Sequence, residues 1–166
     1  MTDEWAGVLD PTERDAVCAR IDDWAARELA SGGSLVAVDR QVGGDPVTGA
    51  PRWYLRLLGE EKEFVTVWLT LRQRTLQHEA QFMPAPDEHV TEVLQYLMRR
   101  NAELFAMAFC LGPEDAVYLV GRVPAALVDD EELDRIAGSS ILYVDDHFPT
   151  AMGLGHPAIY RRRPRR

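Results

Sequence analysis

Between Arg52 and Val123 the chain alternates short apolar stretches with turn residues so regularly that few folds can accommodate it. The pattern predicts three short strands, then one amphipathic helix, then two more strands. A helical pattern stands on either side of this region. The predicted order is therefore α-β-β-β-α-β-β-α, which indicates a single-domain α+β fold with helices packed on a mostly antiparallel sheet.

The second predicted hairpin tests this order, because alternate residues of a strand face opposite sides of the sheet. A short turn at Gln73-Arg74 places apolar residues opposite apolar residues, with only His78 breaking the pattern. The pairs on this face are Leu71 with Leu76, Leu69 with His78, Val67 with Ala80 and Val65 with Phe82. We therefore predict a hairpin with one buried face, while the type of turn stays open.

The first predicted hairpin joins the same buried face if its loop, Gly59 to Glu63, contains five residues. Its other face then pairs Tyr54 with Trp68, and it also carries arginine. That face is too apolar for plain solvent contact and too polar for a core. An aromatic pair edged by arginines is a common composition for a contact surface. The residues predicted to contact a partner are Tyr54, Arg56, Trp68 and Arg72.

An alternative stays open for this surface. Another element of the same chain, such as an edge strand at Leu35–Val42 or a terminus, would cover it. The loop that follows, Gly43 to Gly49, is predicted to be mobile. Its glycines match no phosphate-binding pattern, since no lysine-serine pair or helix start follows.

Each predicted helix has its own boundary residues. Asp10-Pro11-Thr12-Glu13 predicts a capped start for the first helix, and Met83-Pro84-Ala85-Pro86 precedes the second. The third begins in a capping box at Asp129–Glu132 and is expected to end at Pro149. The predicted buried stripes are Val17, Ile21, Trp24, Ala25 and Leu29, then Val90, Val93, Leu94, Leu97 and Met98, then Leu133, Ile136, Ala137, Ile141, Val144 and Phe148.

The strands between the second and third helices are apolar on both faces. Leu104–Leu111 and Ala116–Val123 are therefore predicted to be central strands covered on both sides. Cys18 and Cys110 fall in a predicted helix and a predicted strand. Both are expected to be reduced and buried, because disulfides are rare in the cytosol. A redox pair is the alternative.

Charge is distributed unevenly along the 166 residues. Five of the 18 basic residues lie in 161–166, which leaves 13 basic residues against all 27 acidic ones in the rest. Such an acidic body disfavours nucleic acid as a partner. Residues 1–155 are predicted to form one domain, and residues 156–166 a basic, disordered tail. That tail could instead contact nucleic acid, an anionic membrane or the acidic body itself.

The start of the chain suggests a compartment. Met1 to Trp5 is acidic and lacks the regions of a signal peptide, and no window approaches the length of apolar sequence that spans a bilayer. We expect a cytoplasmic protein.

No reacting group is recognisable. The four histidines are scattered, and His78 is expected to be a core residue with its hydrogen bonds satisfied. Asp145-Asp146-His147 is the one compact group of acids and histidine, but adjacent helical residues point apart. We therefore predict no catalytic residue, no metal site, no cofactor and no enzymatic activity, although a site assembled in three dimensions stays possible.

Several motifs together resemble actinobacterial proteins with a YbjN domain, a family described as putative bacterial sensory transduction regulators. The likeness runs from about Trp24 to Leu154. The motifs that carry it are Arg52–Leu57, Gly59–Phe64, Val67–Leu76, Phe82–Pro86, Arg99–Asn101, Glu114–Gly121 and Asp130–Ile136. The resemblance implies a fold similar to that of type III secretion chaperones, which bind protein partners and often dimerise. It implies no catalytic residue.

The leading hypothesis is a protein-binding regulator or chaperone-like adaptor that forms a homodimer. The competing hypothesis is a small-ligand sensor or an unrecognised enzyme with a pocket between sheet and helix. A third possibility is that the tail, Arg161–Arg166, anchors the protein to nucleic acid or membrane.

Overall fold

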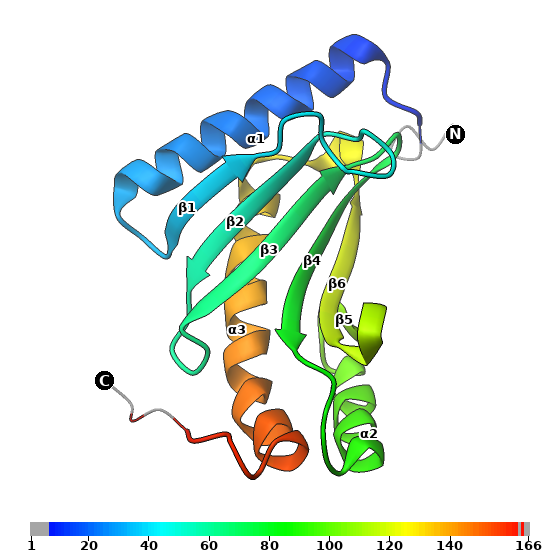
Figure 1. Ribbon diagram of the computed structural model, residues 1–166. Helices are drawn as coiled ribbons and strands as arrows, with labels where there is room; N and C mark the ends of the chain where they lie inside the picture. Colours follow the sequence, from blue (N-terminus) through cyan, green and yellow to red (C-terminus); the bar gives the residue numbers. More distant parts are fainter. Residues whose placement is uncertain (1–6, 163, 165–166) are drawn as a thin grey trace.

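Six antiparallel strands form one sheet in the computed structural model, which describes residues 7–162 and residue 164 (Figure 1). Their order across the sheet is β1-β2-β3-β4-β6-β5. The strands are β1 (Leu35–Arg40), β2 (Arg52–Leu58), β3 (Phe64–Leu71), β4 (Thr75–Met83), β5 (Ala108–Leu111) and β6 (Val117–Pro124). The helices are α1 (Pro11–Ser31), α2 (Val90–Asn101) and α3 (Asp130–Gly155). The predicted α+β order is confirmed, with β1 as the edge strand.

The register of both predicted hairpins is confirmed. Leu69 pairs with His78 across the β3–β4 turn, and Tyr54 pairs with Trp68 between β2 and β3. The apolar side chains of these strands lie beneath the sheet, where α3 crosses behind it (Figure 1). Residues at the centre of this core are Trp53, Leu55, Leu57, Val65, Val67, Leu69, Phe82, Ile136 and Val144.

Helix α1 begins where its capping residues predict. The Asp10 carboxylate accepts a hydrogen bond from the Glu13 amide, and the Glu13 side chain accepts one from the Asp10 amide. Gly32 ends the helix with φ of 68°, a left-handed conformation that favours glycine. The predicted stripe is buried up to Ala25. Leu29 is 39% exposed, so its predicted burial is wrong: it lies in the last turn of the helix.

Helix α2 buries a narrower stripe than predicted. Val93 and Leu97 are buried, whereas Val90 and Met98 are exposed. The helix packs mainly on α3 and β5, so residues on the flanks of its stripe meet solvent. The predicted burial of Val90 and Met98 is therefore wrong.

Helix α3 continues through Pro149 to Gly155, so the prediction that it ends at Pro149 is wrong. A proline costs one backbone hydrogen bond in a helix interior, but buried residues beyond it outweigh that loss. Ala151 and Met152 belong to the core. A Cβ on Gly155 would lie 2.9 Å from the Pro86 Cβ, so the end of α3 approaches the segment before α2 very closely.

The strand before β6 differs most from its prediction. β5 is a four-residue edge strand rather than a central one, and the predicted strand over Leu104–Leu111 is too long. Ala106 has a positive φ of 55°, which interrupts extended structure before the strand can begin. Cys18 is buried as predicted, but Cys110 is exposed because it lies on this edge.

The chain stays packed for several residues beyond Gly155. His156 is buried, and the Tyr160 ring lies 5.8 Å from the Phe148 ring in an edge-on contact. Arg162 pairs with Glu61, so this part of the basic segment contacts the protein's own acidic body. Residues 1–6, 163, 165 and 166 lie outside the described residues. The predictions about the acidic start and the rest of the tail therefore stay predictions.

Candidate functional site

One side of the sheet forms the candidate site. Within the described residues, the helices pack on the opposite side, and Figure 1 shows α3 running behind the strands. Residues on β2, β3 and β4 with the parity of Tyr54 therefore face away from the core. We call this surface the open face and define it by Arg52, Tyr54, Arg56, Phe64, Thr66, Trp68, Gln77 and Glu79.

Aromatic rings and arginines alternate on the open face. The Tyr54 and Trp68 rings lie 4.8 Å apart and meet edge to face. The Arg52 guanidinium lies 4.2 Å from the centroid of the Trp68 ring, and Arg56 lies 3.7 Å from that of Phe64. A guanidinium over the face of an aromatic ring is attracted by the ring electrons, so each contact restrains the arginine side chain.

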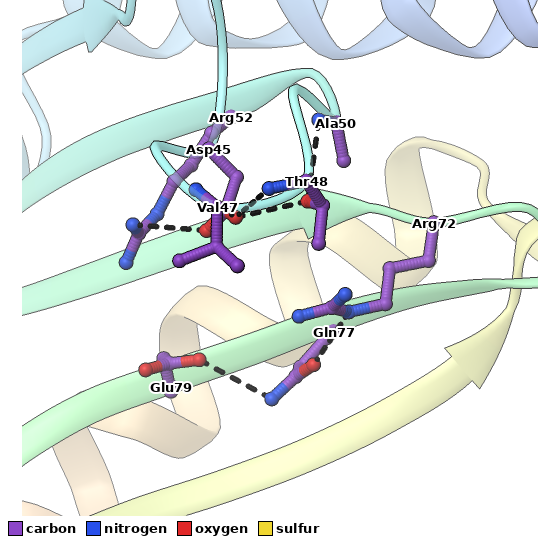
Figure 2. A network of polar contacts seen from close by, with 8 residues as sticks. All are labelled: Asp45, Val47, Thr48, Ala50, Arg52, Arg72, Gln77 and Glu79. Atoms are coloured by element: carbon purple, nitrogen blue, oxygen red, sulfur yellow. Dashed lines mark hydrogen bonds and ion pairs between the residues drawn. The ribbon is translucent and has the colours of Figure 1, made fainter.

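The loop between β1 and β2 is organised by one carboxylate. Asp45 accepts hydrogen bonds from the Val47 amide, the Thr48 amide and the Thr48 hydroxyl, at 3.1, 2.9 and 2.9 Å. Arg52 pairs with the same carboxylate at 3.3 Å (Figure 2). The Thr48 amide, followed by the other donors and Arg52, lowers the pKa of Asp45. Asp45 therefore fixes Arg52 above Trp68.

A second polar chain runs along β4. Arg72 donates from Nε to the Gln77 amide oxygen at 3.0 Å, and the Gln77 amide nitrogen donates to Glu79 at 3.2 Å. Figure 2 shows these side chains in line on the same side of the sheet as Arg52. Arg72 itself follows the last residue of β3 and is exposed.

The structure brings three of the four predicted contact residues together. Tyr54 and Trp68 touch, and Arg56 lies on the neighbouring ring, while Arg72 stands at the end of the face. The alternative that Leu35–Val42 covers this face is wrong, because β1 pairs with β2 and widens the sheet. The role of the four residues in binding a partner stays a prediction.

Sequence reasoning missed Arg52 and Asp45 as parts of this surface. Arg52 has the strand parity of Tyr54, so counting by twos would have found it. The five-residue loop of the first hairpin already predicts Phe64 on this face, opposite Leu58, and that pairing is confirmed. Asp45 lies in a loop without periodicity. The sequence signal that could have found Asp45 is the motif Asp-Pro-Val-Thr, because an aspartate often accepts hydrogen bonds from backbone amides two and three residues later.

His78 lies beneath the sheet. Its side chain is 1% exposed, and its Nε2 has no hydrogen-bond partner among the described residues. The prediction of a core residue is right, but that nitrogen is not satisfied as expected. Burial, together with the nearby Arg135, lowers the pKa of His78 to about 4, so the ring is neutral at pH 7.

The group Asp145-Asp146-His147 has structural partners. Asp145 accepts from the amides of Glu60 and Glu61, while His147 Nδ1 lies 2.9 Å from the Tyr96 hydroxyl. These contacts point in different directions, as adjacent positions on a helix require. In the part of the chain that the structure describes, no group of three or more His, Cys, Asp or Glu is placed to hold a metal ion. No helix there has the length and apolar character to cross a membrane.

Comparison with known proteins gives one family and several bacterial relatives. Residues 42–151 match the family model YbjN, described as "Putative bacterial sensory transduction regulator". The chain is 32% identical over 117 residues to uncharacterized proteins of Mycobacterium tuberculosis and Mycobacterium bovis, covering 70% of this chain and 64% of each relative. It is 33% identical over 112 residues to one of Mycobacterium leprae, covering 65% and 61%. The chain thus spans less than two thirds of each relative's length. The residues that match the family model include the whole open face.

Proposed function

Because this chain belongs to the YbjN family of putative bacterial sensory transduction regulators, we propose that it is a regulator that works by binding a protein partner. In this proposal it acts in the cytoplasm and catalyses no reaction. Its role is that of an adaptor similar to a type III secretion chaperone. A shared fold does not confer a shared function, so the proposal rests on the surface and not on the fold.

The observation that carries the proposal is the composition of the open face. Tyr54 and Trp68 are half-buried with no helix above them among the described residues, and Arg56 is exposed beside them. Tyrosine, tryptophan and arginine are the residue types that dominate the binding energy of protein interfaces. Their side chains are already ordered by ring stacking and by Asp45, which lowers the entropy lost on binding.

A second copy of the chain is one partner that fits this proposal. A two-fold dimer uses the same surface on both subunits, so one aromatic patch would meet its own copy. The resemblance to dimeric chaperones supports this form.

The competing hypothesis of a ligand pocket between sheet and helix receives less support. Leu55, Leu69, Ile136 and Val144 meet in that space and are each at most 1% exposed. Side chains packed this closely leave little room for a ligand.

The test replaces one anchor on the open face. Trp68→Ala is expected to weaken partner binding about 30-fold, since a central aromatic anchor contributes about 2 kcal/mol. Arg56→Glu is a second variant on an exposed position, and it reverses charge without removing a buried group. Light scattering of the purified protein measures self-association. A photo-crosslinking amino acid at Thr66 measures contact with other proteins in the native cell.

Phe105→Ala provides the matched control. Phe105 is 68% exposed, and its amide binds the Tyr143 hydroxyl of α3, so it lies on the helical side of the molecule. Its loss removes an aromatic ring without touching the open face. If Trp68→Ala and Arg56→Glu leave both self-association and crosslinking unchanged, the open face is not a binding surface.

A further inference from the structure

A groove of about 490 Å³ lies at one end of the sheet. Its walls are the first turns of α1, the loop before β2 and the turn between β3 and β4, which gather near the top of Figure 1. The groove is outside the ring-bearing centre of the open face and shares only Arg72 with the predicted contact residues. Its volume is in the range of sites for small molecules.

Three arginines line this groove. Arg14 comes from α1, and Arg72 and Arg74 come from the turn between β3 and β4. Among the described residues that line it, none is acidic. The protein as a whole has 27 acidic and 18 basic residues, so such a concentration of positive charge runs against its average.

The contacts of Arg72 strengthen this reading. Arg72 donates a hydrogen bond to the neutral amide of Gln77, whereas the nearby Arg52 pairs with the carboxylate of Asp45. A neutral acceptor leaves the charge of Arg72 uncompensated by that contact. The bond uses Nε only, so the terminal nitrogens keep the paired geometry that binds two oxygens of one oxyanion.

The backbone that carries these arginines is held in place from two sides. The Gln73 carbonyl accepts from the Leu9 amide at 3.0 Å, just before α1 begins. The Arg74 carbonyl accepts from the Ala125 amide at 2.8 Å. Across the groove, Thr48 is fixed by Asp45. A site with fixed walls binds more tightly, because less conformational entropy is lost.

We propose that this groove binds a small multivalent oxyanion, with a phosphoryl or a carboxylate group held by Arg14 and Arg72. Arginine forks match both groups in shape and charge. The groove is larger than a single phosphate ion requires, so the ligand carries its charged group on a larger body. This activity does not depend on a protein partner at the open face.

Titration calorimetry at low ionic strength tests the proposal, with inorganic pyrophosphate and citrate as probes of the two sources of charge. Saturable binding of either probe by the full chain is expected, and the tighter probe identifies phosphoryl or carboxylate as the ligand group. Arg14→Gln and Arg72→Gln are each expected to weaken binding by at least about tenfold. Both positions are exposed, so their replacement leaves the core intact.

Arg99→Gln is the matched control, since it removes the same charge from an exposed position at the end of α2. The Arg99→Gln and Trp68→Ala variants should both bind the probes as tightly as the unmodified chain does. The proposal is overturned if neither probe binds saturably, or if Arg99→Gln weakens binding as much as Arg14→Gln does. If Trp68→Ala loses partner binding but still binds the probes, then partner binding at the open face and oxyanion binding in the groove are separate functions.

Discussion

At the scale of single residues, positive charge in this protein is nearly all arginine, and several arginines make contacts that depend on the planar shape of the guanidinium. Arg52 lies over the ring of Trp68, and Arg56 lies over that of Phe64. Arg135 donates hydrogen bonds to the Glu132 carboxylate from two of its nitrogens. The single lysine, Lys62, behaves differently. Its ammonium donates to the carbonyls of Gln81 and Phe82, and burial lowers its pKa to about 8. The compact ammonium group of a lysine fits between two converging carbonyl oxygens better than the planar guanidinium of an arginine does.

His78 should make the protein sensitive to acid. Its pKa is about 4 in the folded protein against 6.5 for a free side chain, so the unfolded chain binds a proton that the folded one does not. Stability from this group is complete above pH 6.5 and is lost as the pH falls towards 4. Between pH 7 and pH 5 we expect a loss of about 2 kcal/mol from His78.

Urea unfolding of the normal chain and of His78→Leu at both pH values measures this loss. The leucine variant lacks the titrating group, so its stability should fall by about 2 kcal/mol less across the interval. Carboxylates and other histidines titrate in both proteins and cancel in the comparison. An equal fall in the two proteins would mean that His78 does not stay neutral in the fold.

At the scale of elements, α3 stabilises the hairpin above it through one side chain. Asp145 accepts hydrogen bonds from three successive amides in the β2–β3 turn, those of Glu60, Glu61 and Lys62, at 2.8, 2.9 and 3.2 Å. A carboxylate with three amide donors is a strong acceptor. The turn is thereby fixed to the middle of a helix more than 80 residues later in the chain.

Asp145→Ala is expected to destabilise the protein by about 2 kcal/mol, since it leaves three amides without their acceptor. Asp146→Ala is the matched control, because Asp146 is the next residue on the same helix and is exposed. It should change the free energy of unfolding by about 0.5 kcal/mol or less. Chemical denaturation of both variants measures the difference. Equal effects would show that the contact with the turn contributes nothing.

The hairpins of β2, β3 and β4 could be predicted residue by residue, because their order depends on the alternation of neighbours. His78 and Leu69 share a face for that reason alone. The end of α3 could not be predicted, since Pro149 is a local stop signal that contacts with a distant segment overrule. The edge position of β5 could not be predicted either. Apolar residues show that a strand is buried, but they do not show whether a helix or another strand buries it, and here α2 packs on β5.

The candidate site shows the same division. Tyr54, Arg56 and Trp68 follow from strand parity, so their shared surface was predictable. The groove of Arg14, Arg72 and Arg74 was not, because one of its walls comes from a helix about 60 residues away in the sequence and no motif links them. Only the tertiary fold brings those charges together.

At the scale of the whole molecule, and within the described residues, the helices stand on one side of the sheet and no helix covers the other (Figure 1). An antiparallel sheet tolerates this arrangement when its two faces differ in polarity. Here α3 packs against β2, β3 and β4. The stability of the sheet therefore depends on the last helix.

A chain that stops at Val128 should not fold cooperatively. It lacks Leu133, Ile136 and Val144, which are at most 1% exposed in the folded protein. Losing a whole layer removes more than the 5–15 kcal/mol by which a domain of this size is stable. Binding of a hydrophobic dye and the loss of a thermal transition measure this outcome. A chain that stops at Arg162 is the control, and a sharp transition in the shorter chain would contradict the prediction.

The short reach of β5 has a consequence for crowded solutions. Its free margin exposes the main chain of only four residues before Pro113 begins a bend that cannot continue the ladder. A foreign strand would find too few amides and carbonyls there to align with. At this edge of the sheet, the brevity of β5 guards against stacking into fibrils.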